Sequence, residues 1–575
     1  MFLGISAYFH DSSVALIDSN GDLIDFKKEE YLSRVKGDKS FPRLALTEII
    51  KNHNLSDKNI NKICFYEKPL KAWLTILKYS IKNNSLSNEL TRNYIKNIWK
   101  SSVIFSYDLS KHLKISNDKI LYCDHHLSHT LSGAYYNSKL PAVSIVIDGF
   151  GDESTSSIHH LTSLQEIKHE WSSPFPNSVG LFYSAITDFL GFSVNEGEYK
   201  VMGLAAYGDP IFYESLSKTI FFKDGKLFLD DTYYDFMRSI TRSYSSKFNS
   251  IFNIDERESN TPLDLDSPNF KSYADIAASA QKIVEEILKE IFLFAYKITG
   301  ENRFIFSGGV AMNSVAINKL SKLNFITELI IPPSPGDSGA AIGAAYYSFL
   351  QFNKNYFEKP LKADIPSMLT PGHTSLTDHN EDFFLINYER IAEKDEIIDV
   401  ASELISQNEI IATCYKNIET GPRALGHRSM ICNAHSLLAV KQLNEQIKKR
   451  SKFRPVAPAI LEKNAKKYFL LSDKIYDSYY FMGAVVEVVN SKSIEAVVHN
   501  DNTSRIQLCR EDNILGMILK KLELNNIFVL ANTSFNISSD PIVYSKEDAY
   551  LGIERMNIKY LLTENGIYTK KPIKS

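Results

Sequence analysis

Two segments of the chain begin with the same succession of a β-rich run, a turn and further β-rich residues. Near the N-terminus, residues 2–17 contain two such runs, and Asn20-Gly21 precedes a third at residues 23–26. Asn-Gly between β-rich runs is a strong hairpin signal. A second opening has an apolar run at residues 142–147 and polar–apolar alternation at 156–161. The repetition predicts an α/β domain built from two related halves.

The rest of the chain alternates strand-like and helix-like segments, which is typical of α/β proteins. Apolar runs at residues 304–306 and 329–331 each precede a glycine-containing loop, and small residues fill 340–345. A loop-like, Pro-containing stretch follows and predicts a domain boundary. A helix at 395–407 and strands at 410–414, 484–489 and 527–531 then predict a second α/β domain. We therefore expect a first domain over residues 1–355, a linker over 356–382 and a second domain over 383–575.

Composition excludes several classes of protein. The 575 residues carry 65 Lys+Arg against 68 Asp+Glu, a net charge of −3, so no global basic surface predicts a nucleic-acid partner. No apolar run approaches the roughly 18 residues of a membrane span. The start of the chain has no basic segment of the kind that begins a signal peptide. The five cysteines include no Cys-x-x-Cys pair, which suits a reducing compartment. We expect a cytoplasmic protein that does not span a membrane.

The segment His125-His-Leu-Ser-His129 predicts a metal site. On a helix, His125 and His129 are i,i+4 neighbours on one face, and their imidazoles suit Zn²⁺ or Fe²⁺. His126 could replace His125 through an i,i+3 pairing. A carboxylate from elsewhere is required, and either Asp337 or Asp148 could supply it. The alternative is a structural or solvated histidine cluster.

His10, at the end of the first strand, is a candidate general base, although a histidine bonded to a turn is the alternative. Three glycine turns of the first domain each follow a strand, and they leave two interpretations open, a nucleotide-binding cleft and simple turn chemistry. The three turns are Asp148-Gly-Phe-Gly-Asp152, Ser307-Gly-Gly-Val-Ala-Met-Asn313 and Pro335-Gly-Asp-Ser-Gly-Ala340.

The second domain contains a basic cluster that predicts a phosphate site. Its arginines are Arg423 and Arg428 in Gly421–Ser429, Arg454 after Lys448-Lys-Arg, and Arg505; Asn532-Thr-Ser-Phe-Asn536 adds small polar groups. Guanidinium groups bind phosphate in a bidentate manner, and hydroxyls and amides complete such pockets. A solvated helix face is the alternative. It fits Lys448 and Lys449 well, and it fits Arg423 poorly because glycines and a proline frame that residue.

Taken in order, these motifs resemble the NodU/CmcH carbamoyltransferase family, which includes nodulation, cephalosporin and tobramycin carbamoyltransferases. The resemblance covers nearly the whole chain. It rests on His10-Asp-Ser-Ser-Val-Ala15, His125–His129, Glu196-Gly-Glu-Tyr-Lys-Val-Met-Gly203, Ser307–Asn313, Gly421-Pro-Arg-Ala-Leu-Gly426, Phe453-Arg-Pro-Val-Ala-Pro458 and Asn532–Asn536. It implies a duplicated actin/sugar-kinase-like (ribonuclease H-like) N-terminal domain and an α/β YrdC-like C-terminal domain.

The resemblance also implies an activity. The C-terminal domain would make carbamoyl-adenylate from carbamoyl phosphate and ATP, and the N-terminal domain would pass the carbamoyl group to a hydroxyl of a sugar, antibiotic or other secondary metabolite. ATP, carbamoyl phosphate and a small hydroxylated acceptor are the implied partners, with no nucleic acid or membrane; a homodimer is compatible. The implied cofactors are Fe²⁺ or Zn²⁺ in the N-terminal domain and Mg²⁺ with ATP.

Residue roles follow from the same resemblance. His10 would be the catalytic base, and His125, His129 and Asp337 would bind the metal. The adenylate would contact Asp148, Gly149, Gly151, Asp152, Gly308, Gly309 and Asn313. ATP and carbamoyl phosphate would contact Arg423, Arg454, Arg505, Asn532 and Ser534. Lys36 would lie near the acceptor.

Three positions depart from the family pattern, which often has His, Arg and Glu where this chain has Gly37, Asn417 and Ser451. They leave His10, the histidine pair and Arg423 in place, so we expect an active enzyme. Three alternatives stay open at this point: an N-carbamoyltransferase acting on an amine, a non-catalytic nucleotide-binding protein of the same fold, and, more weakly, a tRNA-modifying enzyme.

Overall fold

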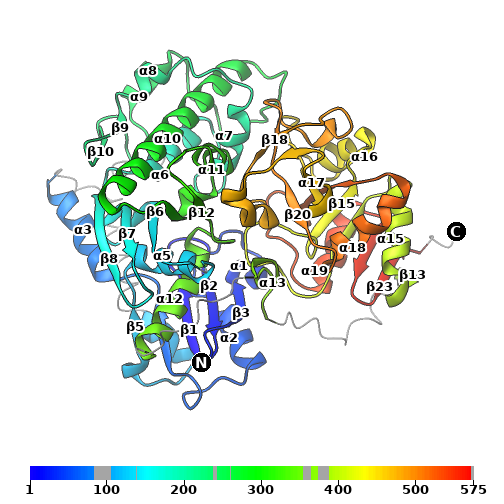
Figure 1. The fold of residues 1–575 in the computed structure, drawn as a ribbon, viewed down its shortest axis with the longest axis horizontal. Helices are drawn as coiled ribbons and strands as arrows, with labels where there is room; N and C mark the ends of the chain where they lie inside the picture. Colours follow the sequence, from blue (N-terminus) through cyan, green and yellow to red (C-terminus); the bar gives the residue numbers. More distant parts are fainter. Residues whose placement is uncertain are drawn as a thin grey trace. The chain divides into compact units, whose positions relative to one another are not determined.

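The computed structural model describes residues 1–82, 105–137, 139–236, 242–259, 261–353, 364–372 and 387–571. The chain forms two compact units (Figure 1). Unit 1 comprises Met1–Glu29 and Gly37–Asp364, and unit 2 comprises Glu30–Lys36 and Ile365–Ser575. Apart from residues 364–372, the predicted linker over 356–382 lies outside the described residues.

Unit 1 contains two five-stranded sheets with the same arrangement. The first has the order β3-β2-β1-β4-β5, and the second has the order β8-β7-β6-β11-β12. In each sheet the first three strands along the chain are antiparallel neighbours and the last two join in parallel. The strands are β1 (Phe2–Ser6), β2 (Ser13–Ile17), β3 (Leu23–Lys28), β4 (Lys62–Phe65) and β5 (Ile120–Tyr122), then β6 (Ala142–Gly151), β7 (Ser154–Leu161), β8 (Ile167–Pro174), β11 (Arg303–Ser307) and β12 (Glu328–Ile330). The predicted duplicated α/β class is confirmed.

Helices α5 (His125–Tyr135) and α12 (Asp337–Phe352) lie between these sheets. Helix α12 packs on β1, β2 and β4, helix α5 packs on β6 and β11, and the two helices pack against each other. The small residues of α12 permit this close approach. A Cβ placed on Gly343 would lie 1.7 Å from the main-chain oxygen of Ser128 on α5, so no side chain fits there.

A long helix, α10 (Phe270–Thr299), organises the remainder of unit 1. It packs against the short helices α6, α7, α8 and α11 and against the β9–β10 hairpin. The other elements are α2 (Arg43–Asn52), α3 (Pro69–Lys82), α6 (Val179–Phe189), α7 (Glu198–Ala205), α8 (Tyr213–Leu216), β9 (Ile220–Lys223), β10 (Lys226–Leu229), α9 (Ser246–Phe252), η2 (Gly309–Met312) and α11 (Ser314–Ser321). Among the described helices of the chain, none has the length and apolar character needed to cross a membrane.

Unit 2 is built on an eight-stranded mixed sheet, which confirms an α/β fold. The order is β13-β23-β22-β14-β15-β21-β16-β20. These strands are β13 (Tyr388–Glu393), β14 (Ile411–Cys414), β15 (Ser429–Asn433), β16 (Ala457–Leu461), β20 (Gln507–Cys509), β21 (Val529–Ser534), β22 (Tyr560–Thr563) and β23 (Gly566–Lys570). Helices α15 (Ile397–Ser406) and α18 (Ile514–Leu522) pack on this sheet and share its apolar core.

Smaller elements complete unit 2. A three-stranded sheet contains β17 (Phe469–Leu470), β18 (Val486–Val488) and β19 (Thr503–Ser504). Helix α19 (Lys546–Met556) packs on β14 and β22. The remaining turns of helix are α13 (Ile365–Met368), α16 (Leu437–Lys441), η5 (Gln442–Ile447), α17 (Glu462–Ala465) and η6 (Asp473–Phe481). All five cysteines of the chain are buried, and none forms a disulfide.

A short N-terminal segment is an integral part of unit 2. Helix α1 (Glu29–Ser33) places Tyr31 in a small core with Ile418 and Tyr544, and the two tyrosine rings stack with centroids 6.1 Å apart. Arg34 follows and donates to the main-chain oxygens of Ile542, at 2.7 Å, and Pro541, at 3.1 Å. The C-terminal part of the sequence therefore does not supply the whole of unit 2.

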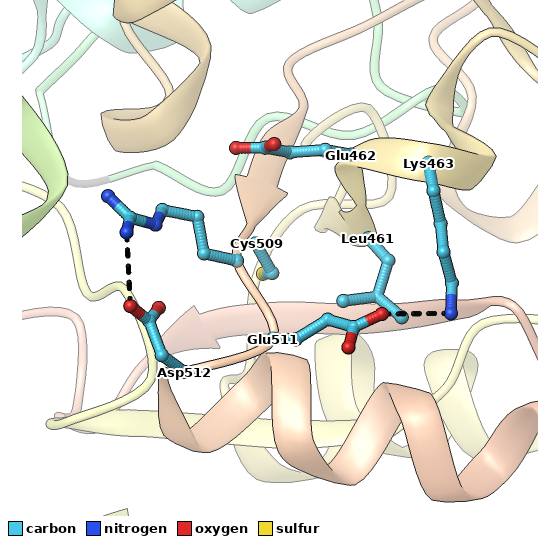
Figure 2. Close-up of a pocket in the computed structure, with 7 residues that line it drawn as sticks. Leu461, Glu462, Lys463, Cys509, Glu511 and Asp512 are labelled. Atoms are coloured by element: carbon cyan, nitrogen blue, oxygen red, sulfur yellow. Dashed lines mark hydrogen bonds and ion pairs between the residues drawn. The ribbon is translucent and has the colours of Figure 1, made fainter.

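A cavity of about 380 Å³ lies in unit 2 where β16 and β20 end (Figure 2). Its lining residues are Leu461, Glu462, Lys463, Cys509, Arg510, Glu511 and Asp512. Lys463 pairs with Glu511 at 3.0 Å and Arg510 pairs with Asp512 at 3.2 Å. These carboxylates offset both cations of the cavity, so it offers little attraction to phosphate. None of the predicted phosphate-binding residues lines it.

The Tyr31 contact predicts a stability effect in unit 2. Replacing the buried ring in Tyr31→Ala should lower the free energy of unfolding of unit 2 by about 3 kcal/mol, because it leaves a cavity beside Tyr544. Tyr31→Phe keeps the ring and serves as the control, with an expected loss below about 1 kcal/mol. Urea unfolding, with hydrogen exchange of peptides around Tyr544, measures both. Equal stability of the alanine variant and the wild type would contradict the assignment.

Candidate functional site

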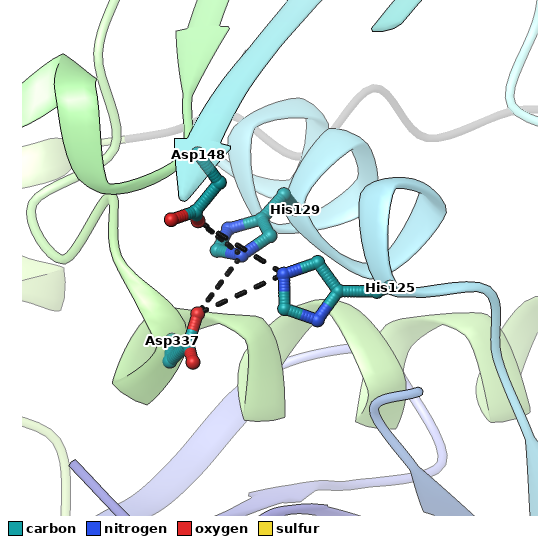
Figure 3. A group of neighbouring side chains, drawn as sticks. All are labelled: His125, His129, Asp148 and Asp337. Carbon is teal, nitrogen blue, oxygen red and sulfur yellow. Dashed lines mark ion pairs between the residues drawn. The ribbon is translucent and has the colours of Figure 1, made fainter. Parts of the chain in front are cut away.

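Four side chains from three elements meet in the interior of unit 1 (Figure 3). His125 and His129 project from one face of α5, as their i,i+4 spacing predicts, while Asp148 is on β6 and Asp337 is the first residue of α12. His129 Nε2 lies 3.3 Å from Asp337 Oδ1 and 3.4 Å from Asp148 Oδ2. For His125 Nε2 the corresponding distances are 3.8 and 3.9 Å. One ligand atom from each residue lies within 4.8 Å of all the others.

The dimensions of this cluster fit a divalent cation. Zn²⁺ binds imidazole nitrogen and carboxylate oxygen at about 2.0–2.2 Å, so ligand atoms of a tetrahedral site lie roughly 3.3–3.6 Å apart. The nitrogen–oxygen distances of 3.3–3.9 Å are close to this value. Two buried carboxylates also carry the charge that a divalent cation balances. The cluster can therefore hold a metal ion, and both candidate carboxylates from the sequence lie in it.

Unsatisfied polar atoms point to the same ligand. Nε2 of His125, Nε2 of His129 and Oδ2 of Asp337 are buried and make no hydrogen bond. His129 Nδ1 lies 3.1 Å from the carbonyl oxygen of Pro335 and can only donate to it, so the neutral ring carries its lone pair on Nε2. This outer contact orients the ring toward the cluster, as in many metal sites.

The electrostatics of the cluster favour positive charge. Burial alone would lower the pKa of His125, but Asp148 and Asp337 raise it to about 9. Burial alone would raise the pKa of Asp148, but the neighbouring histidines lower it below its usual range. Asp148 also accepts main-chain N–H groups from Gly149, at 2.7 Å, and Gly309, at 3.1 Å, which stabilise the ionised form.

His126 does not join the cluster. Its Nδ1 lies 3.0 Å from Ser157 Oγ and 3.2 Å from Ser154 Oγ, both on β7. Burial and the neighbouring histidines lower its pKa well below the usual value, so the ring is neutral. His126 therefore makes a buried polar contact between α5 and β7 of the second sheet.

His10 lies at the edge of the cluster, in the loop between β1 and β2. Its Nε2 is 3.7 Å from Asp337 Oδ2, its Nδ1 is 3.1 Å from Asp11 Oδ2, and its side chain is 20% exposed. Burial would lower its pKa, but Asp337 and Asp11 raise it to about 10. Tyr8 and Asp11 have φ angles of 78° and 51°, so this loop holds two non-glycine residues in the left-handed region. A partly exposed imidazole beside a cation site can exchange a proton with a bound hydroxyl group.

The glycine turns border the same cluster. Gly149 and Gly151 end β6, Gly308 donates its N–H to the Pro335 oxygen, and Gly309 donates to Asp148. Asn313 caps α11 through Ala316 N–H and exchanges two amide hydrogen bonds with Gln281 of α10. The side chain of Asn313 is thus engaged within the protein.

Asp152 is engaged in the same way. Its carboxylate oxygens accept the main-chain N–H groups of Lys68, at 2.9 Å, and His125, at 2.8 Å. Burial raises its pKa to about 6, and the nearby His125 and these two amides oppose that rise.

In unit 2, Lys448 is the centre of a cationic group, and the sequence pattern did not single it out. Only 1% exposed, its Nζ lies 2.9 Å from the Ser534 oxygen and 2.8 Å from Asn536 Oδ1. Burial lowers the pKa of Lys448 well below its usual value, and the positive charges of Arg450, Arg454 and Lys36 add to this effect. The solvated-face interpretation of Lys448 is wrong, because the chain turns at η5 and directs this side chain against the end of β21. Lys449 remains exposed.

Of the other predicted phosphate ligands, Asn532 contacts the Arg423 loop and Arg505 lies near His499. Asn532, two residues before Ser534, donates to the Ala424 oxygen at 3.1 Å and to Gln507 Oε1 at 2.6 Å, so it holds the loop that carries Arg423. Its own Oδ1 is buried without a partner. Arg505 follows β19, and its charge helps to lower the pKa of His499, which burial lowers to about 4.

Lys36 belongs to unit 2. Its Nζ donates to the Ser538 oxygen at 2.9 Å, and its charge acts on Lys448. The resemblance implies that this side chain lies near the acceptor, and this role stays a prediction.

Two further residues organise the Arg423 loop. Glu419 Oε1 accepts N–H groups from Leu425, His427 and Arg428 at 2.6–3.2 Å. Arg428, fully buried, donates to the main-chain oxygens of Tyr415, Lys416 and Tyr544. The sequence shows a glutamate just before a Gly-Pro turn, which could have drawn attention to Glu419. Its partners are main-chain groups, and a sequence pattern does not reveal them.

Comparison with known proteins agrees with this arrangement. Residues 1–346 match the family model described as carbamoyltransferase N-terminus, and residues 402–570 match the one described as carbamoyltransferase C-terminus. The uncharacterized protein sll1178 of Synechocystis sp. is 31% identical over 99% of this chain and 96% of its own length. The nodulation protein NolNO of Sinorhizobium fredii is 26% identical over 95% and 76%, and NolO of Bradyrhizobium diazoefficiens is 29% identical over 78% and 79%.

The chain belongs to the carbamoyltransferase family, of the NodU/NolO type, and is a carbamoyltransferase enzyme. Similarity to solved structures is much lower. The activator of 2-hydroxyisocaproyl-CoA dehydratase from Clostridium difficile has a TM-score of 0.30 and 13% identity, covering 62% of this chain and 97% of that one. HypF of T. kodakarensis has a TM-score of 0.32 and 16% identity, covering 62% and 48%. Scores at this level carry no argument about function.

The cluster in unit 1 predicts metal binding that depends on His129. His129→Ala should lower the affinity for Zn²⁺ by more than the roughly 10–100-fold that follows loss of an outer partner, because a direct ligand is removed. His169→Ala, on the exposed face of β8, is the control and should leave affinity unchanged. Isothermal titration calorimetry of the full chain measures both. Unchanged Zn²⁺ affinity in the His129 variant would contradict the site.

The Glu419 contacts predict a stability effect. Glu419→Ala leaves three N–H groups without an acceptor, two of them buried and that of His427 partly buried, and should lower the free energy of unfolding of unit 2 by about 3 kcal/mol. Glu419→Gln keeps one carbonyl oxygen at this place and should lose about 1 kcal/mol. Urea unfolding compares them. Equal losses in the two variants would show that the three hydrogen bonds are not the cause.

Proposed function

We propose that this enzyme is an ATP-dependent O-carbamoyltransferase that works in two steps. In the first step, water releases phosphate from carbamoyl phosphate. A carbamate oxygen then attacks the α-phosphorus of ATP, forming carbamoyl-adenylate and expelling pyrophosphate. In the second step, an acceptor hydroxyl attacks the carbamoyl carbon, AMP leaves, and the hydroxyl proton passes to the enzyme. The family assignment, together with the buried His125–His129–Asp148–Asp337 cluster, supports this proposal.

We assign the first step to unit 2. We propose that residues 383–575 form a YrdC-like domain and that Lys36 contributes to its site. Lys448, Arg450, Arg454 and Lys36 concentrate positive charge beside Ser534 and Asn536. Such a group attracts the phosphates of ATP and carbamoyl phosphate, and it stabilises the charge that builds up on leaving pyrophosphate. Arg423, Arg505 and Asn532 would complete this site, and Mg²⁺ would accompany ATP.

We assign the transfer step to unit 1. A divalent metal held by His125, His129, Asp148 and Asp337, with Fe²⁺ or Zn²⁺ as candidates, would supply Lewis-acid polarisation and hold the adenylate phosphate. A divalent cation beside Asp337 would offset the negative charge that raises the pKa of His10, so that the neutral ring could take the proton of the acceptor hydroxyl. The main chain of the Asp148–Asp152 and Gly308–Gly309 turns would face the adenylate.

The proposed chemistry defines only the chemical class of the acceptor, which is a compound with a free hydroxyl group. A sugar, antibiotic or other secondary metabolite provides the hydroxyl that this mechanism needs. Mass spectrometry of the product, followed by mild alkaline hydrolysis, separates a carbamate on oxygen from a urea on nitrogen, and a urea product would overturn the O-transfer assignment. The five unpaired, buried cysteines support a reducing, cytoplasmic setting for the proposed enzyme.

The two steps are separable by mutation. Lys448→Met should abolish carbamoyl-phosphate-dependent release of pyrophosphate from ATP, because it removes the amine that bound phosphates would keep protonated beside Ser534 and Asn536. Lys441→Met changes an exposed lysine seven residues earlier, at the end of α16, and should not change this release. His10→Asn should leave pyrophosphate release intact but slow formation of carbamoylated product by about 10²–10⁴-fold.

A coupled phosphate assay and product mass spectrometry measure the two steps on the same preparations. Pyrophosphate release that does not require carbamoyl phosphate would contradict the proposed first step. Normal product formation by the His10 variant would contradict the proposed transfer step.

A further inference from the structure

The turn that ends β6 contacts the metal cluster through more than Asp148. Its last two residues, Gly151 and Asp152, both touch His125, the first residue of α5. The sequence resemblance implies that these two residues contact the adenylate. Their contacts in the structure point to an additional role at His125.

Asp152 holds the main chain at the start of α5. Its side chain is 5% exposed, and its two oxygens accept the N–H groups of His125, at 2.8 Å, and Lys68, at 2.9 Å. It thereby joins three segments that are distant in sequence: the turn after β6, the loop after β4 and the first turn of α5. Both oxygens are directed at main-chain amides of the protein.

The residue in the usual capping position does not do this. Asp124 precedes α5, but its side chain makes no capping hydrogen bond. Its oxygens instead lie 2.7 Å from Lys68 Nζ and 2.8 Å from Lys71 Nζ. The first N–H groups of a helix have no partner within the helix, so a carboxylate from elsewhere has to satisfy them. Asp152 supplies it for His125.

Gly151 makes room for the His125 ring. A Cβ on Gly151 would lie 2.2 Å from His125 Cδ2 and 2.7 Å from its Cγ, closer than any real contact. The ring therefore rests directly on the main chain of the turn. Asp148, three residues earlier, places its carboxylate 3.9 Å from His125 Nε2.

We propose that the Gly151-Asp152 pair positions the metal ligand His125, with Asp152 setting the main chain of α5 and Gly151 setting the place of the imidazole. Metal–ligand distances tolerate deviations of only about 0.2 Å, so a shift of the first helical turn weakens the site. His129, one turn further along α5, has its own outer contact to Pro335. Loss of Asp152 thus weakens the His125 side of the site and leaves the His129 side in place. This inference rests on the proposed metal site.

The test is Zn²⁺ titration of the full chain by calorimetry, with wild type, Asp152→Ala, Asp152→Asn, Gly151→Ala and the control Asp124→Asn. Asp152→Ala and Gly151→Ala should lower Zn²⁺ affinity by about 10–100-fold, as loss of outer partners does. Asp152→Asn keeps one acceptor oxygen and should fall between wild type and alanine. Asp124→Asn should match the wild type, because the carboxylate it alters binds lysine side chains.

Two further readouts separate positioning from general damage. The visible spectrum of bound Co²⁺ should change in the Asp152 and Gly151 variants, since it reports the geometry of the ligands. Pyrophosphate release by unit 2 should stay at the wild-type rate in the same preparations. If Asp152→Ala does not fold, Asp152→Asn and Gly151→Ala carry the test.

The outcomes distinguish this inference from the proposed function. A wild type that binds neither Zn²⁺ nor Co²⁺ would overturn the metal site itself, and this inference with it. Tight Zn²⁺ binding by the wild type and equally tight binding by the Asp152 and Gly151 variants would overturn the inference alone. Loss of AMP binding by the Asp152 variants, with unchanged Zn²⁺ affinity, would overturn the inference and indicate that Asp152 contacts the adenylate.

Discussion

The close crossing of α5 and α12 is the contact on which the functional geometry of unit 1 depends. At Gly343 the two helices approach so nearly that a single Cβ would overlap the Ser128 oxygen. This approach brings the face of α5 that carries both imidazoles to the N-terminal end of α12, where Asp337 lies. Larger residues in the Ala-Gly run of α12 would separate the helices and, with them, the nitrogen and carboxylate ligands.

Around this crossing, main-chain hydrogen bonds orient each ligand. The Pro335 oxygen accepts a hydrogen bond from His129 Nδ1, and the Asp148 carboxylate accepts hydrogen bonds from the N–H groups of Gly149 and Gly309. The Asp152 carboxylate accepts a hydrogen bond from the N–H group of His125. Buried carboxylates and imidazoles are costly unless they are satisfied, so these contacts, with the cation that the cluster can hold, account for a polar centre inside an apolar fold. The duplicated sheets supply the rigid elements from which the contacts arise.

Unit 2 surrounds two buried basic side chains with neutral acceptors. Lys448 is surrounded by carbonyl oxygens and an amide oxygen, and Arg428 by five main-chain acceptor contacts. Neutral acceptors satisfy these donors without cancelling their charge, so an anion bound nearby would favour the protonated form of Lys448, whose pKa burial lowers. The cavity beside β20 shows the contrast, because there each cation faces a carboxylate.

The sequence by itself determined the duplicated α/β class, the helix that carries His125 and His129, and most strands, since local periodicity and turn residues decide these features. It also restricted the metal carboxylates to Asp148 and Asp337, and both lie in the cluster. Tertiary structure alone decided that Lys448 is buried, that Glu30–Lys36 belongs to unit 2, and that Asp152 binds two main-chain amides. These are contacts between residues tens to hundreds of positions apart, and no local pattern encodes which main-chain groups a folded chain brings to a given side chain.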